Sequence, residues 1–472
     1  MGAAMLLRSG KERKWPFDLH KKYKALVPGR MFSAAAQAEA RASTSTDNEP
    51  KCFIKKLNNG MLVGTIETPS PVSRLAVVAN AGSRFESGDN LGIAHLLRQS
   101  AKLRTENMSQ LGIARKSLQL GSDVTCVGTR ELIYYKSNVT RNCAGAMVEI
   151  LQELTTKQVF KPWEVNDLQT NADALPLDLA LYKTQPYIQC VELLHSAAFR
   201  NTLGRSLYAP DFMVGKYHSE QVAQYVKTYF SAGRMALVGV GIGHEELEEL
   251  ASQFETSGSA GVPAEKAAYH SGEVRHNSGG PLTYVAFAYG GPSQSDKDLL
   301  PAEVLKHIMG VGPHIKYSLG TATSQLAKAV SQSTDLPFAV SCLTANYSDG
   351  GLFGFTAVAP SSQVEKVVRS AANQFRGALT SGLSDADVSR AKTQLKAEIC
   401  MQFENPDVLL NWLGEQTLHS DQILTPDEIY KMVDNVTTSD VNNVAKKIAG
   451  TKPTMASTGN TENVPYLDRI FS

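Results

Sequence analysis

NLGIAHLLRQSAKLR, residues 90–104, has the apolar spacing of a helix with one buried face. Asp89 or Asn90 can cap its first turn. The apolar residues that recur at helical spacing are Leu91, Ala94, Leu97 and Ala101. Residues three and four apart on a helix point the same way, so polar side chains between these positions should project together from the other side.

Those polar residues are His95, Arg98 and Gln99, which stand in the frame of the inverted zinc motif H-x-x-E-H. In that motif two imidazoles hold the metal, and the glutamate serves as general base. Gln99 offers only a neutral amide, and Arg98 is permanently protonated, so it cannot accept a proton from water. A unit charge about 4 Å from a divalent ion also repels it by roughly 2 kcal/mol at the dielectric constant of water. We therefore expect degenerate zinc-motif positions, with no metal, no cofactor and no catalytic residue.

Taken alone, His95 would be an ordinary, partly buried histidine on a core helix. Its context is more specific. The run Leu57–Leu97 contains an L-x-N-G hairpin, the turn A-G-S-R-x-E at Ala81–Glu86 and the helix G-x-x-H-L-L. These features resemble the start of the pitrilysin (insulinase-type) metallopeptidase family. The resemblance implies an α+β fold of two homologous domains, each a mostly antiparallel sheet packed with helices.

Within that family, the sequence is most similar to the core subunits of mitochondrial ubiquinol-cytochrome c reductase, respiratory complex III. The stretches that carry this likeness are Arg74, Thr129-Arg130-Glu131, Leu194–Asn201, Ala232–His244 and Asn346–Phe355. The resemblance covers nearly everything after the first fifty residues. It implies a non-catalytic structural subunit on the matrix side of the inner membrane, paired with a related core protein and other complex III subunits. It also implies involvement with the cleaved targeting peptide of the Rieske subunit.

The active family has a third zinc ligand, a glutamate on a later helix, whose counterpart should fall between Trp163 and His195. Counting from Trp163 places it near Leu175, whereas counting back from Leu194–Asn201 places it near Asp178. The register is undecided, and neither position holds glutamate. Asp173 and Asp178 are carboxylates in this region, for which solvated helix or loop positions are expected.

Composition limits the other functions. The chain has 472 residues, 42% of them hydrophobic and 20% charged, and its formal net charge is +1. This balance gives no electrostatic case for binding nucleic acid. No apolar run reaches the roughly 18–20 residues that span a bilayer, so membrane association should come only through partner subunits. Six cysteines are scattered without a C-x-x-C pair, which indicates neither a zinc ribbon nor a disulfide framework.

The amino terminus has the composition of a mitochondrial targeting segment. Residues 1–42 carry nine Lys or Arg against three acids and lack the apolar core of a secretory signal. Arg30-Met31-Phe32-Ser33 resembles a matrix-processing site, which predicts a presequence over 1–32 cleaved near Arg30 and Ser33. The alternative is a disordered basic tail. Residues 33–50 are expected to be a flexible mature amino terminus.

The remainder should form two domains, at 51–255 and 273–472, joined by a linker over 256–272 that is rich in Gly, Ser and Pro. The strands expected are 53–57, 61–67, 73–81, 123–128, 131–139, 234–243, 282–288, 338–345 and 352–358. The helices expected are 111–120, 144–154, 244–250, 298–309, 364–379, one opening at Ser384, one capped at Thr425 and one capped at Ser439.

Two further motifs resemble sites but favour structural roles. His244 precedes a run of glutamates, which fan around a helix instead of converging on a metal. Gly310-Val311-Gly312-Pro313-His314 follows a helix, whereas a nucleotide loop requires G-x-G-x-x-G opening one. Two classes of function therefore remain. The first is the structural subunit. The second is a peptidase function, either as an active metalloenzyme, which Arg98 and Gln99 disfavour, or as the non-catalytic half of a presequence-processing peptidase pair.

Overall fold

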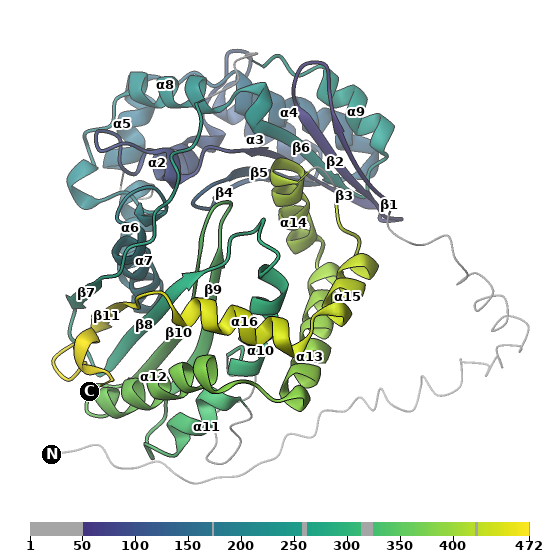
Figure 1. Cartoon of the computed structure of the whole chain (residues 1–472). Helices are drawn as coiled ribbons and strands as arrows, with labels where there is room; N and C mark the ends of the chain where they lie inside the picture. The colour runs from purple at the N-terminus through teal and green to yellow at the C-terminus, as the bar shows by residue number, and fades with distance from the viewer. Residues whose placement is uncertain (1–50, 172–173, 257–261, 313–323, 421–422, 472) are drawn as a thin grey trace, which may run out of the picture. The chain divides into compact units, whose positions relative to one another are not determined.

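The computed structural model describes residues 51–171, 174–256, 262–312, 324–420 and 423–471 (Figure 1). The expected presequence, its cleavage site at Arg30 and Ser33, and the segment 33–50 lie outside the described residues. So do Asp173, Pro313 and His314. Residues 50–472 form one compact unit that contains two sheets.

The first sheet has six strands in the order β1-β2-β6-β3-β5-β4. Its strands are β1 (Lys51–Lys56), β2 (Leu62–Glu67), β3 (Val72–Ala79), β4 (Val124–Gly128), β5 (Ile133–Thr140) and β6 (Met235–Val240). Only β2 and β6 pair in parallel; the other neighbours are antiparallel. Gly60 closes the β1–β2 hairpin with a φ of 88°, a conformation that favours glycine. The six strands expected along this half of the chain are confirmed, with ends that differ by up to three residues.

The described part of this half also holds eight α-helices. They are α2 (Ile93–Gln99), α3 (Gln110–Gln119), α4 (Ala144–Thr156), α5 (Pro162–Thr170), α6 (Leu175–Lys183), α7 (Pro186–Phe199), α8 (Ser219–Tyr229) and α9 (His244–Ser252). Of these, α2, α4 and α9 contact strands of the first sheet. The apolar stripe of α4 is fully buried against the strands, as its spacing predicts: Met147, Ile150, Leu151 and Leu154. Helix α7 belongs to this half of the chain but packs on the second sheet.

The second sheet has five strands in the order β7-β11-β8-β10-β9. Its strands are β7 (Glu273–Asn277), β8 (Leu282–Gly291), β9 (Ala339–Asn346), β10 (Gly351–Pro360) and β11 (Thr454–Gly459). The helices of this half are α10 (Leu299–Met309), α11 (Gln325–Ser331), α12 (Val364–Ser381), α13 (Asp385–Glu404), α14 (Pro406–His419), α15 (Pro426–Asn435) and α16 (Thr438–Ala449). Phe287, Phe355 and Phe375 are fully buried between β8, β10 and α12. The fold is therefore α+β, as expected.

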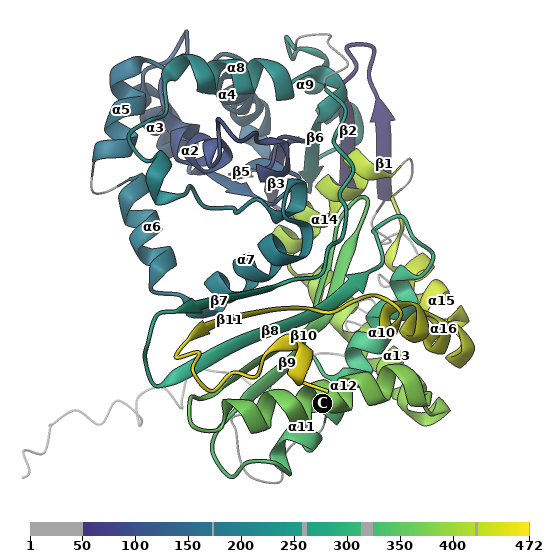
Figure 2. The ribbon, with the colours of Figure 1, turned by 60° about the vertical axis from the view of Figure 1, so that its left-hand side comes forward.

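Each half of the chain sends one helix to the other half's sheet. Helix α14 packs on the first sheet, where Leu410 and Leu413 contact a cluster that includes Val78. Helix α7 packs on β8 and β11 of the second sheet through Leu194 and its neighbours. Figures 1 and 2 show both helices between the two sheets. This exchange was not predicted, and it ties the two halves together.

Two capping predictions were wrong. Helix α2 begins at Ile93, not near Asn90, and neither Asp89 nor Asn90 caps it. In the last helix Thr437, not Ser439, is the cap, because the Thr437 hydroxyl and Asp440 carboxylate form a reciprocal capping box. The caps expected at Ser384 and Thr425 are confirmed. No helix in the described ranges is long and apolar enough to cross a membrane.

Candidate functional site

The position of His95 depends on a buried carboxylate at the start of α2. Glu86 Oε2 accepts a hydrogen bond from the Gly92 amide at 2.8 Å, and Oε1 accepts one from the Ala94 amide at 3.0 Å. Burial raises the pKa of Glu86 to about 7, although these two amides and the nearby Arg205 and Arg98 act in the opposite direction. Glu86 therefore caps α2 from the preceding turn, six residues before the first amide it binds.

Three side chains from the predicted motif region converge beyond this cap. His95 Nε2 lies 2.6 Å from Asp178 Oδ2, and Gln99 Nε2 donates to the same oxygen at 3.2 Å. Leu175 and Asp178, the two positions that the sequence left open, both lie on α6, and Asp178 is the one that contacts His95 and Gln99. Asp178 lies on a helix with its side chain 37% exposed, as expected, but it also binds two side chains of α2, which was not expected.

The hydrogen bonds of His95 fix its protonation. The Ala209 amide donates to His95 Nδ1 at 3.0 Å, so the ring proton must sit on Nε2 and point at Asp178. Burial lowers the pKa of His95 below 6.5, with a smaller contribution of the same sign from Arg98. The hydrogen bond from His95 holds the pKa of Asp178 below its usual value. The pair is thus a neutral imidazole donating to a carboxylate.

Arg98 turns away from this pair. Its guanidinium donates to the Leu207 carbonyl, and its aliphatic stem lies against Gly128, where a Cβ would come within 2.8 Å of Arg98 Cδ. The side chain that replaces the general base is therefore held by the backbone, and its charge acts on His95, Glu86 and Asp178 at a distance.

This geometry does not fit a zinc site of the H-x-x-E-H type. A histidine that binds a metal through one nitrogen normally donates its other ring N–H to an acceptor. If His95 bound a metal through Nε2, its proton would have to move to Nδ1, which faces the N–H of Ala209. No group of three or more His, Cys, Asp or Glu suited to a metal occurs in the part of the chain that the structure describes.

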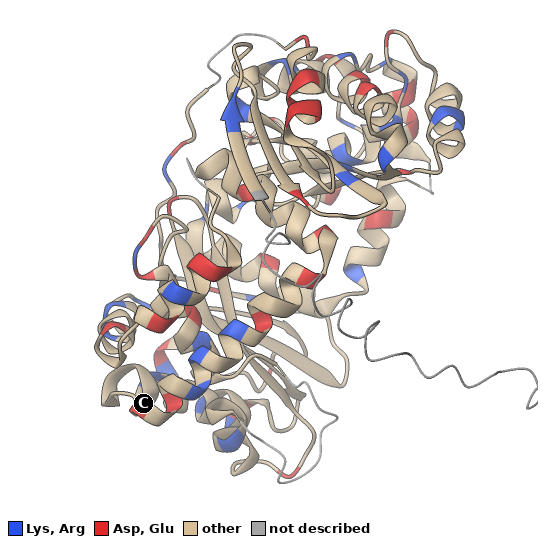
Figure 3. Cartoon of the chain, turned by 90° about the vertical axis from the view of Figure 1, so that its right-hand side faces the viewer, with Lys and Arg blue, Asp and Glu red and all other residues tan. Residues whose placement is uncertain are grey.

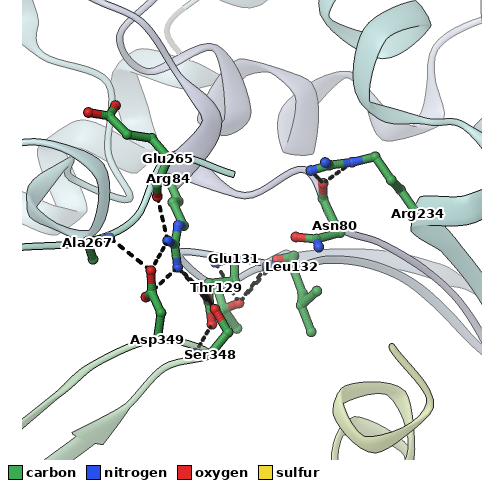
Figure 4. A network of polar contacts seen from close by, with 10 residues as sticks. All are labelled: Asn80, Arg84, Thr129, Glu131, Leu132, Arg234, Glu265, Ala267, Ser348 and Asp349. Carbon is green, nitrogen blue, oxygen red and sulfur yellow. Dashed lines mark hydrogen bonds and ion pairs between the residues drawn. The ribbon is translucent and has the colours of Figure 1, made fainter. Parts of the chain in front are cut away.

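A second polar cluster joins the two halves. Arg84 Nη1 donates to Glu131 Oε1 at 2.6 Å and to Asp349 Oδ1 at 2.8 Å, and its other nitrogen also pairs with Asp349 (Figure 4). Glu131 accepts from the Ser348 amide at 3.0 Å. Arg84 and Glu131 are almost fully buried, and Asp349 also accepts from the Ala267 amide. Three stretches quoted for the family resemblance thus meet at one point, which no spacing in the sequence indicated.

A parallel set of contacts lies beside this cluster. Arg130 pairs with Glu192 at 2.7 Å, and both side chains are buried. The Tyr347 hydroxyl donates to His195 Nε2 at 2.8 Å, because His195 Nδ1 donates to the Val191 carbonyl. Burial and Arg130 hold the pKa of His195 well below 6.5, so its ring is neutral. These residues line a cavity of about 380 Å³ between the halves.

Comparisons with known proteins give consistent matches. Residues 62–211 match the family described as insulinase (peptidase family M16), and residues 217–395 match the peptidase M16 inactive domain. The human mitochondrial cytochrome b-c1 complex subunit 2 is 36% identical over 446 residues, which covers 93% of this chain and 98% of the human protein. The mouse protein of that name is 35% identical over 416 residues, 88% of this chain and 91% of its own length. A probable mitochondrial-processing peptidase subunit alpha-1 of Arabidopsis thaliana is 27% identical over 430 residues, covering 89% and 84%.

Proposed function

Because this chain belongs to the insulinase family of peptidases, peptidase family M16, we propose that it is a non-catalytic structural subunit of the mitochondrial cytochrome b-c1 complex. In this role it supports the assembly and stability of the complex that carries electrons from ubiquinol to cytochrome c. Relatives named as subunit 2 of that complex match it over nearly their whole length, whereas processing-peptidase subunits match at lower identity.

The hydrogen bonding of His95 carries the non-catalytic part of the proposal. Its Nε2 donates to Asp178 while its Nδ1 accepts from Ala209, so neither nitrogen offers a lone pair to a metal. Arg98 and Gln99 supply neither a base nor a second imidazole. We assign His95, Arg98 and Gln99 as degenerate zinc-motif positions that now stabilise the fold.

The remaining assignments follow from this role. The partners are core protein 1 and other complex III subunits, and the chain is peripheral on the matrix side of the inner membrane. Cleavage near Arg30 and Ser33 would remove residues 1–32. The domains would extend over 51–255 and 273–472, with the linker at 256–272.

A shared processing role is the second candidate. Two observations favour it: the cavity of about 380 Å³ between the halves, and the match to processing-peptidase subunits. Core protein 1 would then contribute the active residues, and the Rieske presequence would be the peptide bound.

The test measures zinc content and cleavage of a fluorogenic presequence peptide, first with this chain alone and then after mixing it with core protein 1. Neither zinc nor cleavage is expected in the chain alone. Stoichiometric zinc with chelator-sensitive cleavage in that sample would overturn the non-catalytic assignment. Cleavage only in the mixture would select the processing pair. Restoration of complex III in cells that lack this subunit tests the structural role separately.

A further inference from the structure

Beyond this role, we propose that the groove between α10, α13, α14 and α15 is a docking site for an amphipathic helix of a protein partner, and that the polar face of this helix is basic. The groove is a cavity of about 480 Å³. Figures 1 and 2 both show these helices side by side, and α13 contacts each of the other three. The groove is separate from the His95 cluster, and its chemistry does not depend on the assignment to the cytochrome b-c1 complex.

The walls of the groove are mostly apolar. Leu300, Ile399 and Leu409 come from three different helices. Trp412 on α14 contacts Phe403 on α13 edge to face, with ring centroids 4.9 Å apart, and both rings border the groove. An apolar groove between helices suits a partner helix that inserts apolar side chains at positions i, i+3, i+4 and i+7.

The apolar surface continues to the opening of the groove. Val408 and Met432 belong to the lining, and they are 37% and 42% exposed. Gln402 and Gln416 also line the groove, so amide groups lie beside the apolar side chains. A ligand that fits this surface must therefore have one apolar face and one polar face.

The charges of the groove select the sign of that polar face. Three carboxylates line it against two lysines: Asp296, Glu303 and Glu398 against Lys297 and Lys306. Glu303 and Lys306 form an ion pair at 3.0 Å, and Glu398 lies 2.9 Å from His307 Nε2. With histidine neutral, the lining has an excess of negative charge, which favours a ligand that carries lysine or arginine.

The stretches of chain that carry the lining continue this excess. Residues 294–306, 395–416 and 424–432 hold nine Asp or Glu against four Lys. Three of these charges pair with residues outside the stretches, as Asp298–Lys447, Asp407–Arg74 and Lys396–Asp434. With these pairs set aside, carboxylates still outnumber lysines. Figure 3 shows acidic residues interspersed with basic ones over this side of the molecule, so the apolar walls should supply most of the affinity and the charges its sign.

Helix α14 connects the groove to the contact between the halves. Val408 and Trp412 line the groove, whereas Leu410 and Leu413 of the same helix pack on the first sheet. A docked helix should therefore slow amide hydrogen exchange in α14 as well as in α15.

Fluorescence anisotropy of a labelled peptide tests this site in the full-length chain. The probe is a helical peptide of leucine, alanine and lysine whose leucines follow the i, i+3, i+4 and i+7 spacing. We expect saturable binding together with slower amide exchange in α14 and α15. A variant with Trp15→Phe and Trp163→Phe retains Trp412 as its one tryptophan, and the emission of Trp412 should change when the peptide binds.

Charge substitutions should act with opposite signs. Asp296→Asn and Glu398→Gln should each weaken binding of the lysine peptide about two- to fivefold, the range for one exposed charge pair. Lys297→Gln should strengthen it by a similar factor. Glu245→Gln and Lys452→Gln, at exposed residues outside the groove, are the matched controls and should change nothing.

A methionine pair tests the apolar contribution. Met432→Gln replaces apolar surface at the opening with an amide and should weaken binding. Met401→Gln is the matched control, because Met401 is 62% exposed on α13 and is not among the lining residues.

Several results would overturn the proposal. They are no binding of the lysine peptide, equal binding of a scrambled peptide of the same composition, and binding that leaves Trp412 emission unchanged. Tighter binding of a peptide with glutamate in place of lysine would assign an acidic partner instead. A dimer of this chain that Met432→Gln dissociates, as measured by sedimentation, would assign the groove to a second copy.

Discussion

The imidazole of His95 and the carboxylate of Asp178 lie 2.6 Å apart, Nε2 to Oδ2, across helices α2 and α6. The carboxylate occupies the side of His95 on which a metal would have to bind. Because the Ala209 amide fixes the proton on Nε2, His95 donates to Asp178, and this hydrogen bond joins the two helices.

The first prediction concerns the pKa of His95. Asp178 raises that pKa against the larger effect of burial, so Asp178→Ala should lower it further. A folded-state pKa below the unfolded value of 6.5 means that neutral His95 stabilises the fold above about pH 6.5 and progressively less as the pH falls below it.

Nitrogen-15 NMR of labelled histidine should show the Nε2–H tautomer in the wild type. Asp211→Ala, at an aspartate paired with Lys183, is the control. An Nδ1–H tautomer would contradict the proposed hydrogen bonding.

The second prediction concerns the buried cap of α2. The pKa of Glu86 is about 7 in the folded protein against 4.5 for an ordinary glutamate. Because the folded-state value is the higher one, protonated Glu86 stabilises the fold fully below about pH 4.5, and this contribution is lost as the pH rises to about 7. The difference corresponds to about 3 kcal/mol at 1.36 kcal/mol per pKa unit.

Glu86→Gln should remove this pH dependence. Urea unfolding of both proteins between pH 5 and 8 measures it, as the difference in unfolding free energy between wild type and variant. Glu106→Gln, at an exposed glutamate, controls for the loss of one charge. Parallel pH profiles for wild type and Glu86→Gln would show that this carboxylate does not titrate in the proposed window.

Local patterns predicted most strands and helices of this fold, because apolar spacing reports directly which face of an element is buried. The stripe of α4 and the capping box at Thr425 are examples. The cap of α2 was missed because Glu86 lies in a turn before the helix. The sequence did not indicate that this turn folds back, so that the Glu86 carboxylate reaches the first amides of α2.

Long-range packing could not be predicted in the same way. Helix α14 was not among the expected elements, and nothing in its sequence indicates that it packs on the first sheet. The ion pair between Arg84 and Asp349 spans 265 residues. The contact of Asp178 with His95 likewise depends on how α6 packs against α2, which the sequence did not indicate. In each case the partner is set by the tertiary fold and not by spacing along the chain.

The third prediction tests how α14 packs on the first sheet. A Cβ added to Gly64 on β2 would lie 2.2 Å from Thr417 Oγ1 on α14. Gly64→Ala should therefore destabilise the protein by about 1–3 kcal/mol through overpacking. Thr417→Ala removes the clashing hydroxyl, so the double variant should recover part of that loss. Thermal and urea unfolding of the two single variants and the double variant give the coupling energy.

The control for this cycle is Gly377→Ala within α12, where a Cβ would meet nothing within 4 Å. That variant should be stabilised by up to about 1 kcal/mol, because alanine has the higher helix propensity. Additive effects of Gly64→Ala and Thr417→Ala would place α14 farther from β2 than the structure does.

The fourth prediction concerns the buried cluster that joins the two halves. Arg84→Met removes the cation that neutralises both Glu131 and Asp349, and it leaves two carboxylates with low exposure near each other. Breaking a buried ion pair from one side typically costs about 3–5 kcal/mol.

Lys102→Met breaks the exposed pair with Asp123 and should cost no more than about 1 kcal/mol. Asp349→Asn keeps an acceptor for Arg84 and the Ala267 amide, so its effect should lie between the two. Equal unfolding midpoints for Arg84→Met and Lys102→Met would mean that the cluster does not hold the halves together. If the cluster does hold the halves together, Arg84→Met should also give faster amide hydrogen exchange in α7 and α14. Each of these helices packs on the sheet of the other half, so both depend on the contact between the halves.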